Sequence, residues 1–370
     1  MQPSASLPLD NWPALLARLP PDLDLDEVAR ATKAVRRRRG DGIGDGETLL
    51  RLSLVHGPCG KSLQETAAWA YASGVAEVCA QSLNERLHRA AAFLAALTDR
   101  LIAARQPGPA LVWPGRYLRL VDGSSLSQPG SRGTDWRIHA VYDLGRGGFS
   151  HLSLTDKHGA ESLLRAPPVP GEVAIADRLY ARARELAACL DPSSGMARDF
   201  IIRAGWNALA LCRPDGQRFN LIAALERMAA ATAPQEWRVQ ALTGPAATPT
   251  RVPLRLIAMP LPTEKADANR QRLKHRASRR QQTLDPRSLV AAGFVILVTS
   301  LPDSIPAAEI AAAYRLRWQI ELGFKRLKSL LHIDRLPTRT EAGCRSWLHA
   351  HLILALLSDD MCQDILAAFP

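Results

Sequence analysis

The sequence predicts an α/β protein in which a mixed β-sheet is flanked by helices and preceded by an all-α N-terminal domain. Residues 1–108 are basic and show helical punctuation. Between residues 116 and 206, short apolar segments alternate with glycine- and aspartate-containing turns, a pattern typical of strands. From residue 293 a strong strand pattern runs into a long helical pattern that starts at Pro306. These three observations predict a helical part followed by a sheet that helices cover.

The charge balance of the chain favours a polyanionic partner. The 370 residues include 47 Lys and Arg against 36 Asp and Glu, which gives a net charge of +11 and a pI of about 9.8. Nucleic acid is the first candidate for a protein of this charge. The sequence shows neither a secretory leader pattern nor an apolar run long enough for a membrane span. We therefore expect a cytoplasmic protein that binds no membrane.

Two helix starts stand out in the N-terminal part. Ser62 with Glu65 and Ser82 with Glu85 both match the capping-box spacing, and the turn at Ser73 and Gly74 lies between them. The pattern resembles a helix-turn-helix, with longer spacing than the compact motif. An ordinary helical bundle fits the pattern equally well, and the arginine run at residues 36–39 separates this part from an N-terminal arm.

The middle of the chain predicts the sheet. Prolines and glycines between residues 106 and 116 mark a boundary. Strands are expected over residues 116–125, 136–144 and 149–156, the last two forming a hairpin, and then over 172–177 and 199–206 with a helix at 178–190 between them. Antiparallel strands followed by a β-α-β unit indicate a mixed sheet.

Five segments follow from these boundaries. We expect a helical DNA-binding domain at 1–108, the first part of the core at 109–212, an insertion at 213–292, the second part of the core with a long helix at 293–340, and a C-terminal helical segment at 341–370.

Two aspartates lie at the ends of predicted strands. Asp122 shares a strand face with Leu118 and Leu120, and Asp177 shares a face with Val173 and Ile175. A carboxylate that points the same way as core residues is costly without a partner, and a divalent cation would be such a partner. Capping of the following helix or turn is the alternative explanation for either residue.

The long helix carries a polar line beside an apolar seam. Tyr314, Arg317, Glu321 and Lys328 fall within roughly 60° of one another on an ideal helix. The adjoining arc is apolar and consists of Leu316, Ile320, Phe324, Leu327 and Leu331. The polar line reproduces the pattern Y-x2-R-x3-E-x6-K, which resembles the signature of bacterial insertion-sequence transposases of the DDE class. "VDGSS" and "ADR" are similar to the two aspartate motifs of that family.

The resemblance covers about residues 110 to 335 and implies most of the functional expectations. It implies an RNase H-like core with a β-rich insertion. Asp122, Asp177 and Glu321 would be catalytic and would bind two Mg²⁺ ions, for which Mn²⁺ could substitute. Tyr314, Arg317 and Lys328 would hold DNA phosphates. It also implies an enzyme that cuts the ends of an insertion sequence and joins them to target DNA, acting as a homodimer on double-stranded DNA in the bacterial nucleoid.

Several further residues are candidates for DNA contact or for plain structure. Arg203 ends a strand near the expected cleft and is as suited to phosphate contact as to a structural role. The segment 269–282 is expected to track DNA through Arg270, Arg272, Lys274, Arg276, Arg279 and Arg280. Phe294 is expected in the core; the alternative, which only the resemblance implies, is an aromatic residue of the insertion that stacks on a flipped base. His139 and His151 are expected to be structural, with an approach to the acids as the alternative.

Two other functions compete with transposition. A domesticated or inactive relative would only bind DNA, but Asp122, Asp177 and Glu321 are all present. A metal-dependent nuclease without strand transfer would cut DNA, but it gives no reason for the complete line of Tyr314, Arg317, Glu321 and Lys328.

Overall fold

The computed structural model describes residues 11–35, 42–228, 233–245 and 247–368, with side chains described up to Met361. The arginine run at residues 36–39 lies outside these ranges. The chain divides into two compact units. We call residues 1–108, 123–159 and 321–370 the helical unit, and residues 109–122 and 160–320 the sheet unit. Within the described chain, no helix has both the length and the apolar character needed to cross a membrane.

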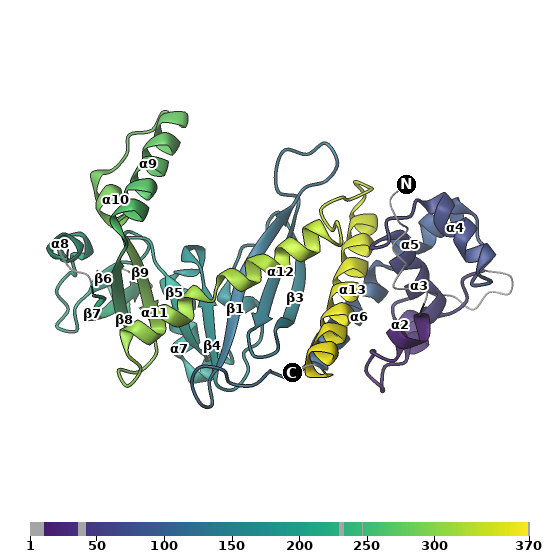
Figure 1. Ribbon diagram of the computed structural model, residues 1–370, viewed down its shortest axis with the longest axis horizontal. Coiled ribbons are helices and arrows are strands. Elements are labelled where there is room, and N and C mark those ends of the chain that lie inside the picture. The colour runs from purple at the N-terminus through teal and green to yellow at the C-terminus, as the bar shows by residue number, and fades with distance from the viewer. Residues whose placement is uncertain (1–10, 36–41, 229–232, 246, 369–370) are drawn as a thin grey trace. The chain divides into compact units, whose positions relative to one another are not determined.

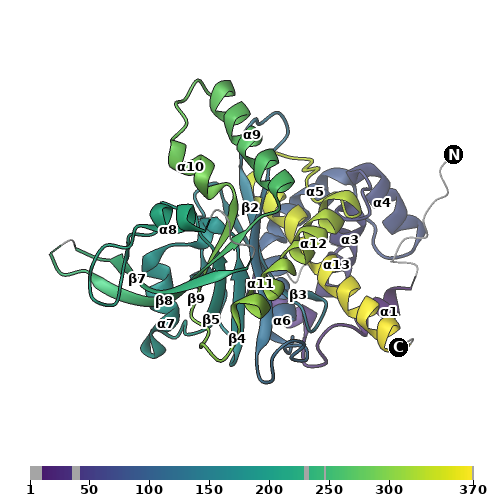
Figure 2. The ribbon, with the colours of Figure 1, turned by 60° about the vertical axis from the view of Figure 1, so that its left-hand side comes forward.

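The helical unit is built around its C-terminal helix. Its N-terminal helices are α1 (Trp12–Leu16), α2 (Leu25–Ala31), α3 (Gly46–His56), α4 (Leu63–Ala72), α5 (Ala80–Arg89) and α6 (Ala91–Ala103). Helix α13 (Glu341–Ala368) packs against α3, α5 and α6, and Figure 2 shows it running beside them. The residues of α13 from Leu348 to Leu357 are buried. The C-terminal segment therefore joins the N-terminal helices, so the compact units group the predicted segments differently from their order in the chain.

One of the two predicted capping boxes is confirmed and the other is wrong. At α4, Ser62 Oγ accepts the Glu65 amide at 3.2 Å and Glu65 Oε2 accepts the Ser62 amide at 2.8 Å. Helix α5 starts at Ala80, and its N-cap is Cys79, whose sulfur accepts the Ser82 amide at 3.5 Å. Ser82 is thus inside the first turn, because Ala80 and Gln81 continue the helix toward the N-terminus.

The hairpin of the helical unit forms as predicted. Strands β2 (Trp136–Asp143) and β3 (Gly148–Asp156) pair antiparallel across the glycine-rich turn. His139 is buried and lies 2.8 Å from Thr155 Oγ1 through its Nε2 atom. This contact supports the structural role expected for His139.

The sheet unit contains a mixed sheet, as predicted (Figure 1). The strands run in the order β1 (Tyr117–Leu126), β4 (Glu172–Ala176), β5 (Asp199–Arg203), β9 (Phe294–Thr299), β8 (Thr250–Pro260), β7 (Gln235–Thr243) and β6 (Leu211–Cys212). Strand β1 passes into the helical unit after Asp122. Strands β1, β4 and β5 are parallel to one another, and the pairings from β5 to β9 and onward are antiparallel. Helix α7 (Ala183–Leu190) makes the β-α-β connection between β4 and β5.

A buried ion cluster links β1 to β4. Glu172 Oε2 accepts Arg119 at 2.6 Å, and Glu172 Oε1 accepts Arg198 at 2.9 Å. The Glu172 and Arg198 side chains are fully buried, so each charge depends on its partner. This cluster holds the register in which Val121 pairs with Ala176.

The insertion is β-rich only in its first half. After helix α8 (Leu221–Arg227), strands β7 and β8 form a hairpin that extends the core sheet beside β9. Residues 263–291 then form helices α9 (Thr263–Arg279) and α10 (Pro286–Ala291). The prediction of a β-rich insertion is wrong for this half, because α9 consists largely of Ala, Arg, Lys, Gln and Leu, which are strong helix formers.

The long helix predicted from Pro306 is interrupted by a tight turn. Helix α11 (Ala307–Arg315) ends before Leu316, and helix α12 (Trp318–Ser329) begins after Arg317. The amides of Leu316 and Arg317 bond the carbonyls three residues before them, at 3.0 and 3.1 Å. Such bonds wind the chain at three residues per turn. The expected seam is confirmed for Ile320, Phe324 and Leu327, which are buried, while Leu316 and Leu331 are half-buried.

Candidate active site

Asp122 and Asp177 occupy matching positions on neighbouring strands of the sheet unit. The parallel register pairs Leu120 with Ile175 and Val121 with Ala176, and each aspartate is the next residue along. Adjacent strands lie about 4.8 Å apart, and the matched register puts both carboxylates on the same face. The two carboxylates therefore lie on one face of one sheet.

Each aspartate already has a partner in the structure. Asp177 Oδ1 accepts the Leu179 amide at 2.7 Å and caps the short 3-10 helix Arg178–Tyr180. The capping role considered from the sequence is therefore real for Asp177. Asp122 Oδ2 lies 3.7 Å from an Arg317 guanidinium nitrogen, and both side chains are about one-fifth exposed. Arg317 thus approaches the acid pair through Asp122.

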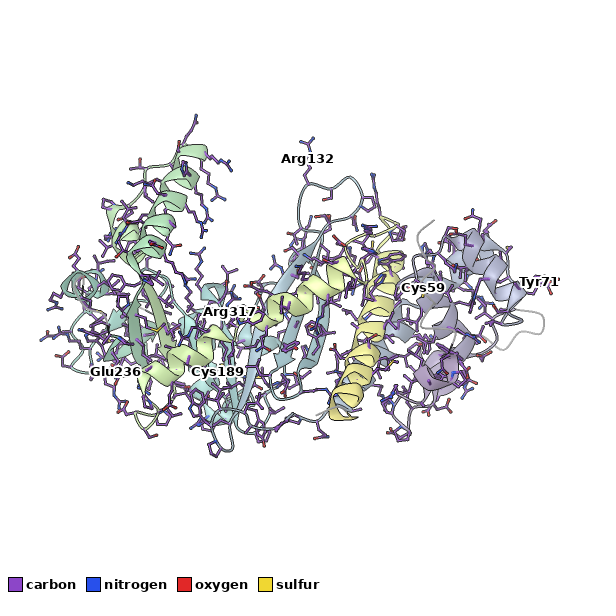
Figure 3. The ribbon with its side chains drawn as sticks, in the orientation of Figure 1. Cys59, Tyr71, Arg132, Cys189, Glu236 and Arg317 are labelled. Carbon is purple, nitrogen blue, oxygen red and sulfur yellow. The ribbon has the colours of Figure 1, made fainter. Side chains whose placement is uncertain are left out.

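The turn between α11 and α12 sets the position of Arg317, which Figure 3 labels between the two helices. Tyr314 and Arg317 are three residues apart, and a turn of three residues brings such positions onto the same side. Burial raises the pKa of the Tyr314 phenol, and the nearby guanidinium groups of Arg317 and Arg203 oppose part of this rise. Arg317, Arg203 and Asp177 therefore all lie within electrostatic reach of the Tyr314 phenol.

A cavity of about 690 Å³ in the sheet unit brings these residues together. Residues after β4 and β5, at the end of α11 and along α9 and α10 line it. The predicted site residues among them are Asp177, Arg203, Arg272, Arg276, Tyr314 and Arg317. The cavity also has apolar walls, which include Leu179, Trp206, Phe294 and Ile296. The Phe294 side chain is 8% exposed, so it belongs to the core as expected and also forms part of the cavity wall.

The predicted basic cluster on α9 separates into different roles. Arg272, His275, Arg276, Arg279 and Arg280 line a second hollow of about 640 Å³. Arg270 instead pairs with Asp267 at 2.7 Å and donates to the Leu289 carbonyl at 3.3 Å, so it fastens α9 to α10. Lys274 is exposed and lines neither hollow.

Trp206 is a cavity residue that sequence reasoning missed. Its indole nitrogen donates to Ser288 Oγ at 3.2 Å, and the Arg287 guanidinium lies 4.4 Å from its ring centre. These contacts link the loop after β5 to α10. The only local signal for Trp206 was its place in "AGW", at the end of the predicted strand. Its role in the cavity depends on where α10 docks, which the local sequence does not show.

Two predicted site residues belong to the helical unit. Glu321 is exposed in the first turn of α12. Lys328 is half-buried in the last turn of α12, and its ammonium group donates to the Ser125 carbonyl at 3.2 Å. Lys328 therefore fastens α12 to the end of β1 within this unit.

The aspartate pair has the chemistry of a hard-cation site. Carboxylate oxygens are the ligands that Mg²⁺ and Mn²⁺ prefer, and two of them at matching strand positions can share an ion. Among the residues that the structure describes, no three His, Cys, Asp or Glu side chains are grouped so as to hold a metal. Asp122 and Asp177, two of the three carboxylates that the resemblance implies as metal ligands, lie at matched strand positions.

Comparison with known proteins identifies the family. Residues 113–357 match the model of the transposase DDE domain family, a stretch that contains both aspartates, Glu321 and the cavity. The chain belongs to this family. As a DDE transposase it is an enzyme whose partner is DNA, and its family generally uses divalent metal ions.

Relatives of this transposase match it along nearly all of its length. It is 38% identical over 359 residues to the transposase for insertion sequence element IS421 from Escherichia coli, covering 96% of this chain and 95% of the relative. It is equally identical, over 358 residues and with the same coverage, to InsL of insertion sequence element IS186A from Escherichia coli strain K12. The transposase is therefore of the bacterial insertion-sequence type.

The fold of the transposase is similar to that of a solved piggyBac transposase in a synaptic complex with hairpin DNA. The TM-score is 0.50 with 9% sequence identity, and the match covers 96% of this chain and 73% of the other. At this identity the likeness concerns the fold, and it supports the RNase H-like architecture expected from the sequence.

Proposed function

We propose that this transposase cuts DNA at the ends of its insertion sequence and joins them to target DNA by metal-dependent hydrolysis and strand transfer. One observation carries the proposal: Asp122 and Asp177 lie at matched positions on neighbouring strands, beside a cavity lined by arginines. Two carboxylates can hold metal ions, and the arginine side chains around them can bind the phosphodiester. Asp122, Asp177 and Glu321 would hold two Mg²⁺ ions.

The side chains around the acids have separate tasks. Bound divalent cations supply the charge that activates a water molecule and stabilises the leaving oxygen. Arg203 and Arg317 bind phosphate oxygens of the strand to be cut, because guanidinium groups pair with phosphate through two parallel hydrogen bonds. The raised pKa of Tyr314 keeps its hydroxyl protonated at neutral pH, so it donates a hydrogen bond to the same strand.

The DNA partners are the terminal inverted repeats of the element and the target duplex. The net charge of +11 and the basic face of α9 support binding to backbone phosphate. Helices α4 and α5, which a turn at Ser73 and Gly74 connects, are suited to contact the repeats. Because two ends must be joined to one target, we propose that a homodimer assembles the synaptic complex, and that it acts at the bacterial nucleoid.

The test is a cleavage and joining assay on DNA that carries the element's own terminus. Wild type should nick this DNA with Mg²⁺ and join the freed 3′ end to a plasmid. Asp177→Asn and Glu321→Gln should abolish nicking while end binding stays nearly intact, because they remove ligand charge without a large change in shape. Asp215→Asn, an exposed acid in the sheet unit, is the matched control and should cut normally.

The outcomes separate the competing functions. Cutting without joining would identify a nuclease, and binding without cutting would identify an inactive relative. Normal cleavage by either Asp177→Asn or Glu321→Gln would overturn the proposed mechanism.

A further inference from the structure

A single carboxylate connects three neighbouring strands of the sheet unit. Glu172 is the first residue of β4, which lies between β1 and β5 (Figure 1). Its Oε2 atom accepts a hydrogen bond from Arg119 of β1 at 2.6 Å, and its Oε1 atom accepts one from Arg198, the residue before β5, at 2.9 Å. Each carboxylate oxygen thus ties β4 to a different neighbour. We call Arg119, Glu172 and Arg198 the strand clamp.

The same three strands carry residues of the candidate site. In β1, β4 and β5 the residues directly before Asp122, Asp177 and Arg203 are matched with one another by the parallel register, so these three lie at one level. Glu172 comes five residues before Asp177, which is about 16 Å along the strand and on the opposite face of the sheet. Any effect of the strand clamp on the two acids must therefore pass along the strands.

The backbone ladder of parallel strands does not define the register by itself. Its hydrogen bonds repeat along the strand, and a slip of two residues keeps every side chain on its own face. Val173 and Ile175 are both apolar, so core packing distinguishes such a slip only weakly. The slip would move Asp122 by about 6.6 Å relative to Asp177, whereas the ions of a two-metal site lie about 3.5 to 4 Å apart.

The strand clamp distinguishes the two registers because its charges are buried. The side chains of Glu172 and Arg198 are fully buried, and that of Arg119 is 5% exposed. A slip would separate these charges away from water, which is costly. Arg198 also donates to the Ala166 carbonyl at 2.7 Å, so it cannot follow a moving strand without losing a second bond. Fixing a register is the best-attested use of a buried polar group.

We propose that Glu172 and its two arginine partners are positioning residues that keep Asp122 and Asp177 level for metal binding. This inference rests on the proposed function, since it takes the two aspartates as metal ligands. The strand clamp supplies no ligand of its own. It sets the register, which decides whether both carboxylates can reach the same ion.

The experiment measures Mn²⁺ binding without DNA, so its result does not depend on cleavage. Electron paramagnetic resonance of the free ion gives the dissociation constant. Glu172→Gln removes the charge that both arginines share, and this loss can unfold the protein. The decisive variant therefore carries Arg119→Met, Glu172→Met and Arg198→Met, because apolar side chains of similar volume can replace a buried ion cluster without loss of stability.

The methionine variant should melt near the wild-type temperature, followed by circular dichroism, and bind Mn²⁺ roughly tenfold to a hundredfold more weakly. The Mg²⁺ concentration for half-maximal nicking should rise in the same way. The nicking rate at saturating Mg²⁺ should largely recover, because bound metal selects the level register. A purely structural role would not separate these two quantities.

Glu236→Met with Arg255→Met is the matched control, because it removes a 2.6 Å ion pair between β7 and β8 of the same sheet. It should bind Mn²⁺ as wild type does. Wild-type Mn²⁺ affinity in the strand-clamp variant would overturn the inference, as would an equal loss in the control. Loss of the fold in the strand-clamp variant would also overturn it, since the cluster would then be purely structural. Equal Mn²⁺ binding by wild type and Asp177→Asn would instead reject the metal site of the proposed function, on which the inference stands.

Discussion

Individual cationic side chains in this transposase differ in role although the sequence presents them as one group. Arg270 fastens α9 to α10, Lys328 bonds a backbone carbonyl, and Arg276 faces the cavity. Composition identified the basic segment, but it could not show which side of α9 each basic residue occupies. The face of each residue depends on how α9 docks through the buried Ala266, which is a tertiary contact.

Arg317 is the residue whose substitution best separates phosphate positioning from charge. Arg317→Ala should weaken DNA-end binding and lower the nicking rate on the order of a hundredfold, because a poorly positioned phosphate reacts slowly. Arg317→Lys should recover only part of the rate, since an ammonium group lacks the planar pair of donors. Single-turnover nicking and anisotropy on the same DNA measure both effects. Full activity in Arg317→Lys would show that charge alone is sufficient.

At the scale of elements, the core strands were predictable from the residues, whereas β7, β8 and the helix junctions were not. Strands β1, β4, β5 and β9 are apolar segments bounded by turn residues, so local pattern defines them. The turn at Leu316 and Arg317 contains neither glycine nor proline. It is formed by backbone hydrogen bonds between residues three apart, and no residue type in the local sequence indicates such bonds. Cys79 was missed as an N-cap because cysteine rarely has this role.

The true and the false capping boxes give a paired stability prediction. Ser62→Ala should lower the free energy of unfolding by about 1 kcal/mol, because it removes the acceptor of the Glu65 amide. Ser82→Ala should have almost no effect, because Ser82 lies inside the first turn of α5 and alanine is a strong helix former. Urea unfolding followed by circular dichroism measures both. Equal losses would mean that α5 begins at Ser82 in solution.

At the scale of the whole molecule, the helical unit depends on contacts between residues far apart in the chain. His349 on α13 lies 3.1 Å from the Thr98 hydroxyl on α6, 251 residues away in the chain. His351, also buried on α13, bonds the Trp347 carbonyl of its own helix at 2.7 Å. Helical periodicity predicted α13 itself, but no local pattern could predict that it packs on α3 and α6.

The buried histidines of α13 predict acid sensitivity. Burial lowers the pKa of His349 and of His351 to about 4, while both titrate near 6.5 in the unfolded chain. The unfolded state therefore takes up protons first as the pH falls, and stability is lost between about pH 6.5 and pH 4. Each imidazole contributes at most about 3 kcal/mol to this loss.

Urea unfolding at pH 7 and at pH 5 tests this expectation. The wild type should be less stable at the lower pH, and the variant with His349→Gln and His351→Gln should show a smaller difference between the two. The same difference in the variant would place the acid sensitivity elsewhere in the chain.

The cap formed by Asp177 gives the transposase a route to self-inhibition. Asparagine caps a helix start about as well as aspartate does, so Asp177→Asn should keep the turn at Leu179 and the fold around it. Such a copy would be abundant and would occupy element ends without cutting them. A single base change could therefore turn one copy of the element into a repressor of its active siblings, and a cell carrying both should transpose less often than a cell carrying the active copy alone.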